Sequence, residues 1–524
     1  MKKLLFLLLS LIVTLSGMSQ YGFETFIPTE DGVFREGKLV VETSDHGFII
    51  SLEAQNKYKN EILVKMSSEG VVSNKLVFQI DGKNLKYCGL FHHPENEEEY
   101  LAVATLDEGN TPDTYIQKEL AFVKLDADLN ILSQTVYDFG DDYVRLSTVT
   151  RTPFLILEDD GTITMATSCQ KTDCYCYLFA SFTNDGLILK QRDSEIFPGP
   201  APKMLNSFSK KRTDGSFGMI LSDNSSGDFF CKADTAFNIT RMGKLLLLPI
   251  RVVENQQLNV TDSTYYYMFP QGTVEYLNDS VSLVTTGGRY VKHIGNENGW
   301  FNFIATLDDS LNVLSNDIWD IGKEVQDHST TALSARDKAI AVTNDAIFHC
   351  GVVGIKDHGH NSVYGVQAST ITVSKFDKEL NLIWRRYYGG DGFFYDINII
   401  QSTADGGCIM TGVYSKQFDV YNFSSYILKV DENGYDAIGE NVESIAKPYF
   451  CYPNPAKDIV YIELSPDVNC QSVELYTLDG RLVKTCHGAS QQTTINVENL
   501  NAGVYILKIR MADGREFSEK IIKE

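Results

Sequence analysis

The most informative segment of the sequence reads Val373-Ser374-Lys375-Phe376-Asp377, followed by Leu380-Asn381-Leu382-Ile383-Trp384. It has the pattern of a strand that ends in Asp, a turn that carries Leu-Asn, and a second strand. The same unit recurs at residues 122–132 and 304–314, and weaker copies begin near residues 62, 178 and 426. A second motif precedes these units: a turn of Asp, Asn or Gly followed by an apolar strand, as in Asp405-Gly406-Gly407-Cys408-Ile409-Met410.

The two motifs together define seven repeats, which begin near residues 44, 98, 158, 212, 278, 344 and 403. Spacings of 54 to 66 residues fit four short strands plus loops, the size of one propeller blade. Stacked blades bury the faces that a lone sheet would expose. We therefore predict an all-β fold with a β-propeller over residues 21–440, seven blades rather than six or eight. A row of β-sandwiches would need linkers about every 90 residues, and none precedes residues 441–448.

The C-terminal segment has a different strand pattern. Alternating apolar and polar residues at 460–464 and 473–476 predict strands, and Asp479-Gly480 predicts the tight turn of a hairpin. Further strands are expected near residues 503–509 and 516–523. We predict a linker at residues 441–448 and a small β-sandwich at residues 449–524.

This segment closely resembles the C-terminal sorting domain of proteins exported by the type IX secretion system of Bacteroidetes. The matching residues, in order, are Pro453, Asn454, Pro455, Asp479, Gly480, Gly503, Tyr505, Lys508, Lys520 and Lys523. The resemblance implies two partners, the secretion translocon and the surface-attachment machinery. It also implies an extracellular location, either released or attached to the outer-membrane surface. The central repeats likewise resemble propeller-like repeats of secreted Bacteroidetes proteins.

The N-terminus has the features of a signal peptide over residues 1–20. Met1-Lys2-Lys3 is a positive start, an apolar run follows from Leu4 to Leu15, and small or polar residues follow it. A transmembrane helix needs about 20 apolar residues, so this run is too short to be one. No other window is apolar enough, and we expect no transmembrane segment.

Composition excludes one class of partner. The chain has 46 Lys+Arg against 69 Asp+Glu, a formal charge of −23. Nucleic-acid binding depends on neutralising phosphates with basic side chains, so we expect no nucleic-acid partner. Nothing in the sequence calls for a cofactor.

Cysteines offer possible disulfides, since oxidation is permitted in an exported protein. Cys169 and Cys174 are separated by four residues that suit a hairpin turn, so their side chains could face each other. Cys176 lies two residues further along the same strand face. Metal binding and simple strand cysteines are the alternatives. Cys470 and Cys486 flank the Asp-Gly hairpin and are a second candidate pair.

Metal-ligating patterns are weak. Asp126, Asp128 and Asn130 match the first three ligand positions of a calcium loop, but neither the sixth-position Gly nor the closing Glu is present. Turn formation by Asp and Asn explains the pattern more simply. His92-His93 and His358-x-His360 lie in polar segments where solvated side chains are the ordinary expectation. We therefore predict no metal site.

No catalytic residue can be assigned, because no His-Glu-x-x-His, Gly-x-Ser-x-Gly or phosphate-binding glycine loop is present. Two hypotheses follow. The first is a non-catalytic secreted or cell-surface protein that binds a glycan or a protein. The second is an extracellular hydrolase of polysaccharide or peptide, with acidic residues in the propeller channel. Aromatic clusters at residues 265–267 and 393–395 could stack on sugars, or could pack between blades.

Overall fold

The computed structural model describes residues 22–523, with short gaps. The predicted signal peptide (1–20) and linker (441–448) lie outside the described residues. The gaps are residues 28–32, 55–59, 108–115, 147–152, 173, 195–203, 211–213, 224–226, 245–250, 256–259, 269–272, 279, 293–297, 311, 321–329, 335–336, 357–368, 390–392, 417–422, 437–448, 453–455, 465–469, 478–480, 488–491 and 512–515.

The chain forms two compact units, Met1–Gly439 and Glu440–Glu524. All regular elements in the described residues are β-strands, which agrees with the all-β prediction. The described part of the chain contains no helix with the length and apolar character needed to cross a membrane.

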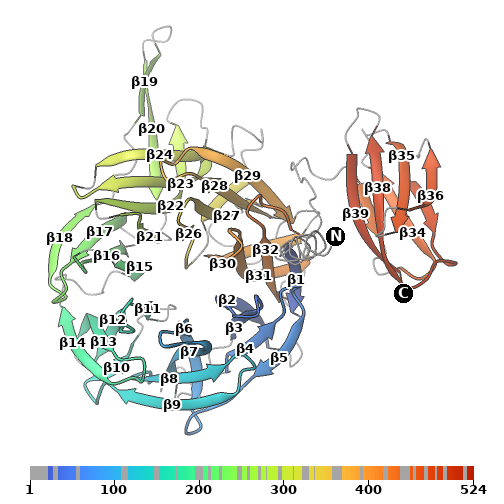
Figure 1. The fold of residues 1–524 in the computed structure, drawn as a ribbon. Helices are drawn as coiled ribbons and strands as arrows, with labels where there is room; N and C mark the ends of the chain where they lie inside the picture. Colours follow the sequence, from blue (N-terminus) through green and yellow to red (C-terminus); the bar gives the residue numbers. More distant parts are fainter. Residues whose placement is uncertain are drawn as a thin grey trace, which may run out of the picture. The chain divides into compact units, whose positions relative to one another are not determined.

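In the first unit, the described strands form seven antiparallel sheets (Figure 1). Strands that follow one another in the sequence pair with one another, as expected for a repeat. The first sheet contains β2 (Arg35–Glu42), β3 (Phe48–Ala54), β4 (Ile62–Met66) and β5 (Val72–Leu76). The second contains β6 (Asn84–His93), β7 (Asn96–Asp107), β8 (Glu119–Asp126) and β9 (Ile131–Asp138). The third contains β10 (Tyr143–Arg145), β11 (Phe154–Leu157), β12 (Ile163–Lys171), β13 (Tyr175–Phe182) and β14 (Ile188–Ser194).

The remaining sheets follow the same plan with additional strands. The fourth contains β15 (Met204–Lys210), β16 (Phe217–Asp223), β17 (Gly227–Ala233) and β18 (Ile239–Lys244). The fifth contains β19 (Arg251–Asn255), β20 (Val260–Met268), β21 (Thr273–Tyr276), β22 (Val281–Lys292), β23 (Asn298–Asp308) and β24 (Val313–Asp320). The sixth contains β25 (Thr330–Ser334), β26 (Ile340–Val342), β27 (Ile347–Lys356), β28 (Thr370–Phe376) and β29 (Leu382–Gly389). The seventh contains β30 (Phe393–Ser402), β31 (Cys408–Lys416), β32 (Phe423–Val430) and β1 (Phe23–Ile27).

The seven sheets are arranged in a ring, in which each sheet contacts the next and the seventh contacts the first (Figure 1). The strands nearest its centre are β2, β6, β11, β15, β21, β26 and β30. The two ends of the unit meet in one sheet, because β1 pairs with β32 from Phe23 opposite Lys429 to Ile27 opposite Ser425. The N-terminal strand thus supplies the outermost strand of the last sheet.

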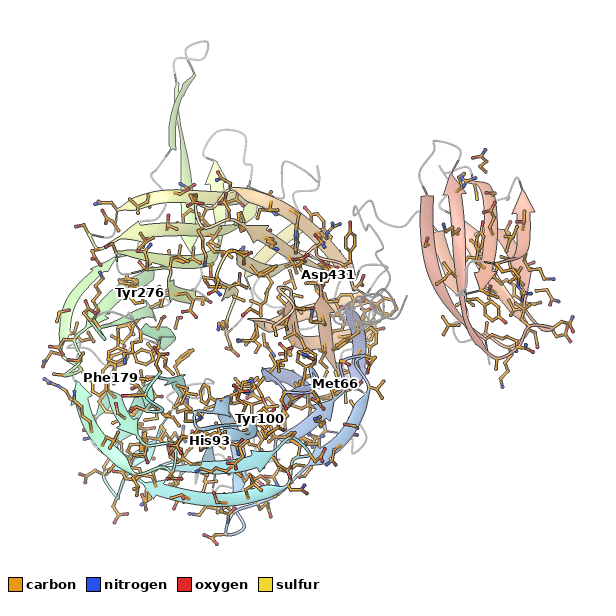
Figure 2. All side chains as sticks on the ribbon, viewed as in Figure 1. Met66, His93, Tyr100, Phe179, Tyr276 and Asp431 are labelled. Carbon is orange, nitrogen blue, oxygen red and sulfur yellow. A yellow bond between two sulfur atoms is a disulfide. The ribbon has the colours of Figure 1, made fainter. Side chains whose placement is uncertain are left out.

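The core of this unit lies between the sheets rather than inside any one of them. Phe48, Ile49 and Ile50 are consecutive in β3, and all three are fully buried. Successive strand residues point to opposite faces, so burial of all three means that both faces of the sheet are covered. Figure 2 shows two large side chains of this kind, Tyr100 and Phe179, within the ring.

The outer strands of the first six sheets begin with a β-bulge. In the second sheet, Leu125 pairs with Ile131 and Lys124 with Ser133, which leaves Leu132 as the extra residue. The same shift occurs at the outer strands of the first, third, fourth, fifth and sixth sheets, namely β5, β14, β18, β24 and β29. The extra residues include exposed apolar side chains, namely Leu132, Leu189, Leu314 and Ile383. Bulges disturb the edge of a sheet, which protects it from pairing with another chain.

The second unit consists of two sheets around one core. One sheet contains β33 (Tyr449–Tyr452), β34 (Ile459–Leu464) and β37 (Gln492–Asn496). The other contains β35 (Cys470–Thr477), β36 (Leu482–His487), β38 (Gly503–Met511) and β39 (Glu516–Lys523). Their inward-facing residues share one buried cluster, which includes Val460, Ile462, Ile495, Val473, Leu475, Leu507 and Ile521.

Candidate functional site

The inner strands of the ring carry bulges that sequence analysis did not find. The pairing of β2 with β3 shifts between Gly37 and Leu39, so Lys38 is an extra residue in β2. Cys88 in β6, Asn206 in β15 and Asn398 in β30 are extra residues in the same sense. A bulge changes the direction in which a side chain points. Two of these positions, Lys38 and Asn398, take part in a polar network near the centre of the ring.

A buried charge cluster connects the first and second sheets. Lys38 Nζ lies 2.8 Å from Glu53 Oε2, and Lys86 Nζ lies 4.0 Å from Glu61 Oε1. The backbone N–H of Tyr87 donates a 2.7 Å hydrogen bond to Glu61 Oε2. Both lysines are also largely buried. We call Lys38, Glu53, Glu61 and Lys86 the charge cluster.

Glu61 is the more deeply buried of the two carboxyl groups in the charge cluster. Its side chain has no solvent exposure, and its Oε1 accepts no hydrogen bond from the described residues. Burial raises the pKa of Glu61 to about 7, and the nearby Glu53 carboxylate adds to this increase, while Lys38 and Lys86 oppose it. Burial alone would lower the pKa of Lys38, but the carboxylates of Glu53, Glu61 and Asp337 outweigh it and raise that pKa.

The network extends to the sixth and seventh sheets through hydrogen bonds. The backbone N–H groups of Asp337 and Lys338 donate to the carbonyl oxygen of Asn398, at 2.8 and 3.1 Å. The side-chain amide of Asn398 donates to the carbonyl oxygen of Gly37, at 2.8 Å. Gly37 precedes Lys38 in β2, so these hydrogen bonds connect the sixth, seventh and first sheets of the ring.

Other carboxylates on or beside the inner strands are also paired. Lys338 Nζ lies 3.6 Å from Glu275 Oε1, and the Ser209 hydroxyl donates to Glu275 Oε2 at 2.9 Å. Lys210 forms an ion pair with Glu158. Such pairs join neighbouring sheets.

The aromatic cluster predicted at residues 393–395 lies on the seventh sheet. Tyr395 is buried and packs against Tyr414 and Tyr426, with ring centroids 5.4 and 5.0 Å apart. Phe393 is only partly buried and lies 5.1 Å from Tyr414. The cluster therefore has a buried side and an accessible side. The other aromatic cluster, residues 265–267, lies in β20, and the structure does not describe the side chains of that cluster.

The predicted calcium residues Asp126, Asp128 and Asn130 come together in the turn between β8 and β9. Asp126 Oδ1 accepts hydrogen bonds from the backbone N–H groups of Asp128 and Asn130, at 2.9 and 2.8 Å. Its Oδ2 accepts a 2.8 Å hydrogen bond from the Asn130 side-chain amide. The turns that begin at Asp234, Asp308 and Asp377 repeat this pattern. In each, the carboxylate serves the backbone of its own turn.

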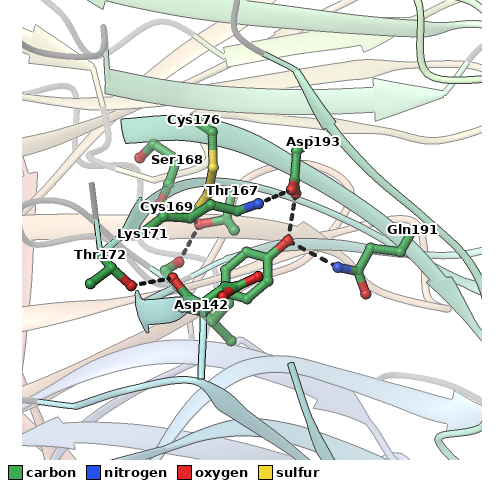
Figure 3. Close-up of a disulfide and its surroundings, with 11 residues drawn as sticks. Asp142, Thr167, Ser168, Cys169, Lys171, Thr172, Cys176, Gln191 and Asp193 are labelled. Carbon is green, nitrogen blue, oxygen red and sulfur yellow. Dashed lines mark hydrogen bonds and ion pairs between the residues drawn. A yellow bond between two sulfur atoms is a disulfide. The ribbon is translucent and has the colours of Figure 1, made fainter. Parts of the chain in front are cut away.

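The disulfide differs from the one predicted. Cys169 is bonded to Cys176 (Figure 3). Cys174 is an exposed free thiol. The Lys171 N–H donates to the Cys174 carbonyl oxygen at 2.8 Å, so the hairpin turn is shorter than the spacing suggested. This register places Cys169 opposite Cys176, with Cα atoms 5.3 Å apart.

The second cysteine pair is also not formed. Cys470 and Cys486 are both free thiols. Cys470 pairs with Met511 on β38, whereas Cys486 pairs with Val473 on the other side of β35. Cys470 and Cys486 therefore do not face each other, although they flank the same hairpin in the sequence.

The histidine candidates do not form a metal site in the described residues. His93 is buried beside Asn184, whose amide lies 3.4 Å from His93 Nε2. No group of three His, Cys, Asp or Glu side chains with the spacing of a metal site occurs in the part of the chain that the structure describes. His358 and His360 lie outside that part.

Several of the predicted sorting residues lie in the second unit at defined positions. Gly503 begins β38 with φ of 154°, a conformation that residues with a side chain rarely adopt. Tyr505 is buried, and its hydroxyl donates to the Asn501 carbonyl oxygen at 2.9 Å. Lys508 Nζ lies 5.7 Å from the centre of the Tyr476 ring. Lys523 is buried at the end of β39, and Lys520 lies in the same strand. The structure does not describe Pro453, Asn454, Pro455, Asp479 and Gly480.

A family comparison agrees with this arrangement. Residues 451–524 match the family described as the secretion system C-terminal sorting domain. The second unit is a type IX sorting domain. A protein that carries this domain is secreted through the type IX system and is often attached to the cell surface. The sorting domain thus gives the chain its extracellular location and one partner, the secretion machinery.

Comparisons of the whole chain give weaker results. No curated protein matches it. The polysaccharide lyase Uly1 has a TM-score of 0.39 and 10% identity, over 76% of this chain and 90% of the lyase. A protein of unknown function from Dyadobacter fermentans has a TM-score of 0.38 and 9% identity, over 78% and 98% of the two chains. An α-L-arabinofuranosidase from Fusarium graminearum has a TM-score of 0.34 and 10% identity, over 78% and 97%. All three TM-scores are too low to carry an argument about activity.

Proposed function

We propose that the protein is a seven-bladed β-propeller, exported by its sorting domain, that binds an extracellular ligand without catalysing its conversion. The first unit is the binding domain and the second is a β-sandwich that directs export. The proposal includes a signal peptide at residues 1–20, which would be removed before the second export step. The ring of seven sheets supports the propeller, because each sheet contacts its two neighbours.

One observation carries the non-catalytic assignment. Glu53, Glu158 and Glu275 lie on or beside the inner strands, and each is paired with a lysine. A general acid or base must be able to exchange a proton with a substrate. The Glu53 pair joins two strands of the first sheet, and the Glu158 and Glu275 pairs join neighbouring sheets, so all three carboxylates are suited to holding the ring together.

The alternative, a hydrolase of polysaccharide or peptide, is favoured by Glu61 alone. A carboxyl group with a pKa near 7 could act as a general acid at neutral pH. However, the Glu61 side chain is fully buried, while Glu53 beside it is 25% exposed. A hydrolase would therefore need a rearrangement that exposes Glu61 to the substrate.

A turnover assay tests the proposal. The purified protein would be incubated with neutral hexasaccharides and with a denatured polypeptide, and the mixture would be separated by chromatography. We expect the probes to be recovered intact. Cleavage that is lost in both Glu53→Gln and Glu61→Gln, but not in the exposed control Glu97→Gln, would establish the hydrolase instead.

A further inference from the structure

A row of aromatic rings crosses one face of the seventh sheet. We call Phe26, Phe393, Tyr395, Tyr414 and Tyr426 the aromatic strip. Strand pairing places Phe26 opposite Tyr426 and Tyr395 opposite Tyr414. The Phe26 ring lies 4.5 Å from Tyr414 and 5.4 Å from Tyr426, measured between centroids. Residues from the outermost strand, β1, and from the innermost strand, β30, thus form one continuous aromatic surface.

The strip has a buried floor and an accessible top. Tyr395 and Tyr426 are buried in the core between the sixth and seventh sheets. Phe393 and Tyr414 pack against that core and remain partly accessible, while Phe26 is 41% exposed. Exposing phenyl and phenol rings to water costs free energy. Three accessible rings in contact with one another are therefore more informative than a single exposed apolar residue.

Polar groups border the same surface. Glu24 is exposed and lies two residues before Phe26 in β1, so both side chains are on the same face. The Tyr426 hydroxyl donates a 3.0 Å hydrogen bond to Glu24 Oε1. Burial, with a smaller effect of the Glu24 carboxylate, raises the pKa of Tyr414 to about 12, so its hydroxyl stays protonated at neutral pH. The strip therefore combines ring faces with a carboxylate acceptor and a hydroxyl group.

This combination restricts the chemistry of a ligand. An aromatic face is electron-rich and attracts C–H groups with partial positive charge, and a carboxylate accepts hydrogen bonds from hydroxyl groups. A sugar ring supplies both kinds of group. A polyanion would be repelled by Glu24 and by the net charge of −23. The apolar side chains of an aliphatic peptide would cover the Glu24 carboxylate without donating hydrogen bonds to it, at a cost in free energy.

We propose that the aromatic strip, with Glu24, binds a neutral carbohydrate chain. This inference rests on the proposed binding function and adds its ligand class and its location on the seventh sheet. Phe26, Tyr414 and Phe393 would stack against successive sugar faces, and Glu24 would accept hydrogen bonds from sugar hydroxyls. Sequence analysis identified residues 393–395 but could not bring Phe26 to them, because nearly 370 residues separate the two segments.

Calorimetric titration with defined probes tests this site. The probes would be neutral β-linked hexasaccharides of glucose, xylose, mannose and N-acetylglucosamine, added to the full-length secreted protein. Phe26→Leu keeps an apolar side chain but removes the ring, and Leu382→Ala is a matched exposed control on the sixth sheet. We expect at least one hexasaccharide to bind, and its Kd to increase about 3- to 10-fold in Phe26→Leu and in Tyr414→Leu only.

The other outcomes separate this inference from the proposed function. A hexasaccharide that binds wild type and both strip variants equally would overturn the strip and leave a binding protein with another site. No binding of any hexasaccharide would overturn the carbohydrate assignment. Binding of pentalysine that weakens in Phe26→Leu and at high salt would show that the strip takes cations instead. Unfolding midpoints in urea, measured for every variant, identify any loss of affinity that is due to misfolding.

Discussion

Replacement of Glu61 by Gln should stabilise the protein at alkaline pH but not at acidic pH. The folded-state pKa of Glu61 is about 7, against an ordinary value of 4.5. Since a tenfold change in proton affinity is worth about 1.4 kcal/mol, ionised Glu61 costs the folded state about 3 kcal/mol. This cost is absent below pH 4.5, grows between pH 4.5 and 7, and is complete above pH 7. Gln cannot ionise and can still accept the hydrogen bond from Tyr87.

Urea unfolding followed by intrinsic fluorescence measures this effect at pH 5 and at pH 8. At pH 8 the free energy of unfolding of Glu61→Gln should exceed that of wild type by up to about 3 kcal/mol. At pH 5 the two should differ by much less. The control variant Glu97→Gln changes an exposed glutamate of β7, and its free energy of unfolding should equal that of wild type at both pH values. A difference between Glu61→Gln and wild type that is the same at pH 5 and pH 8 would refute the reasoning.

Three further predictions concern the ring and its turns. Phe23→Ala, in the buried part of β1, should lower the free energy of unfolding by about 3 kcal/mol, and an unchanged urea midpoint would contradict the role of β1 in closing the ring. Asp126→Ala removes three hydrogen bonds from one turn and should cost about 1 kcal/mol, equally with EDTA or with millimolar calcium; a calcium-dependent difference would instead indicate a bound ion. Alkylation without reduction, followed by mass spectrometry, should modify Cys174 and leave Cys169 and Cys176 linked; a linked Cys174 would contradict the observed pairing.

The repeat in the sequence predicted the strands and turns well because it reflects local physics. Asp, Asn and Gly at fixed positions form the turns, and the buried strands read as apolar runs. Asp126 and Asn130 illustrate this point, because their turn is stabilised entirely by their own backbone and side chains. The sorting domain was equally recognisable, since its residues occur in a fixed order near the end of the sequence.

Other features depend on contacts between distant segments and could not be read from local patterns. The cysteine prediction failed because the hairpin turn is shorter than expected, which places Cys176 rather than Cys174 opposite Cys169. The bulge at Lys38 has no local signal, and its role depends on Glu53 from the adjacent strand. The pairing of β1 with β32 joins segments about 400 residues apart. The aromatic strip follows from that pairing, because β1 supplies Phe26.

Hydrogen–deuterium exchange of β1 and β32 tests the closed ring most directly. Closure predicts that the amides of Phe23–Ile27 that face β32 are protected together with the paired residues 425–429, and that both sets exchange with the rate of the core strands. Phe23→Ala should accelerate exchange in both segments. Rapid exchange of Phe23–Ile27 in the wild-type protein, with residues 425–429 still protected, would contradict closure of the ring by the N-terminal strand.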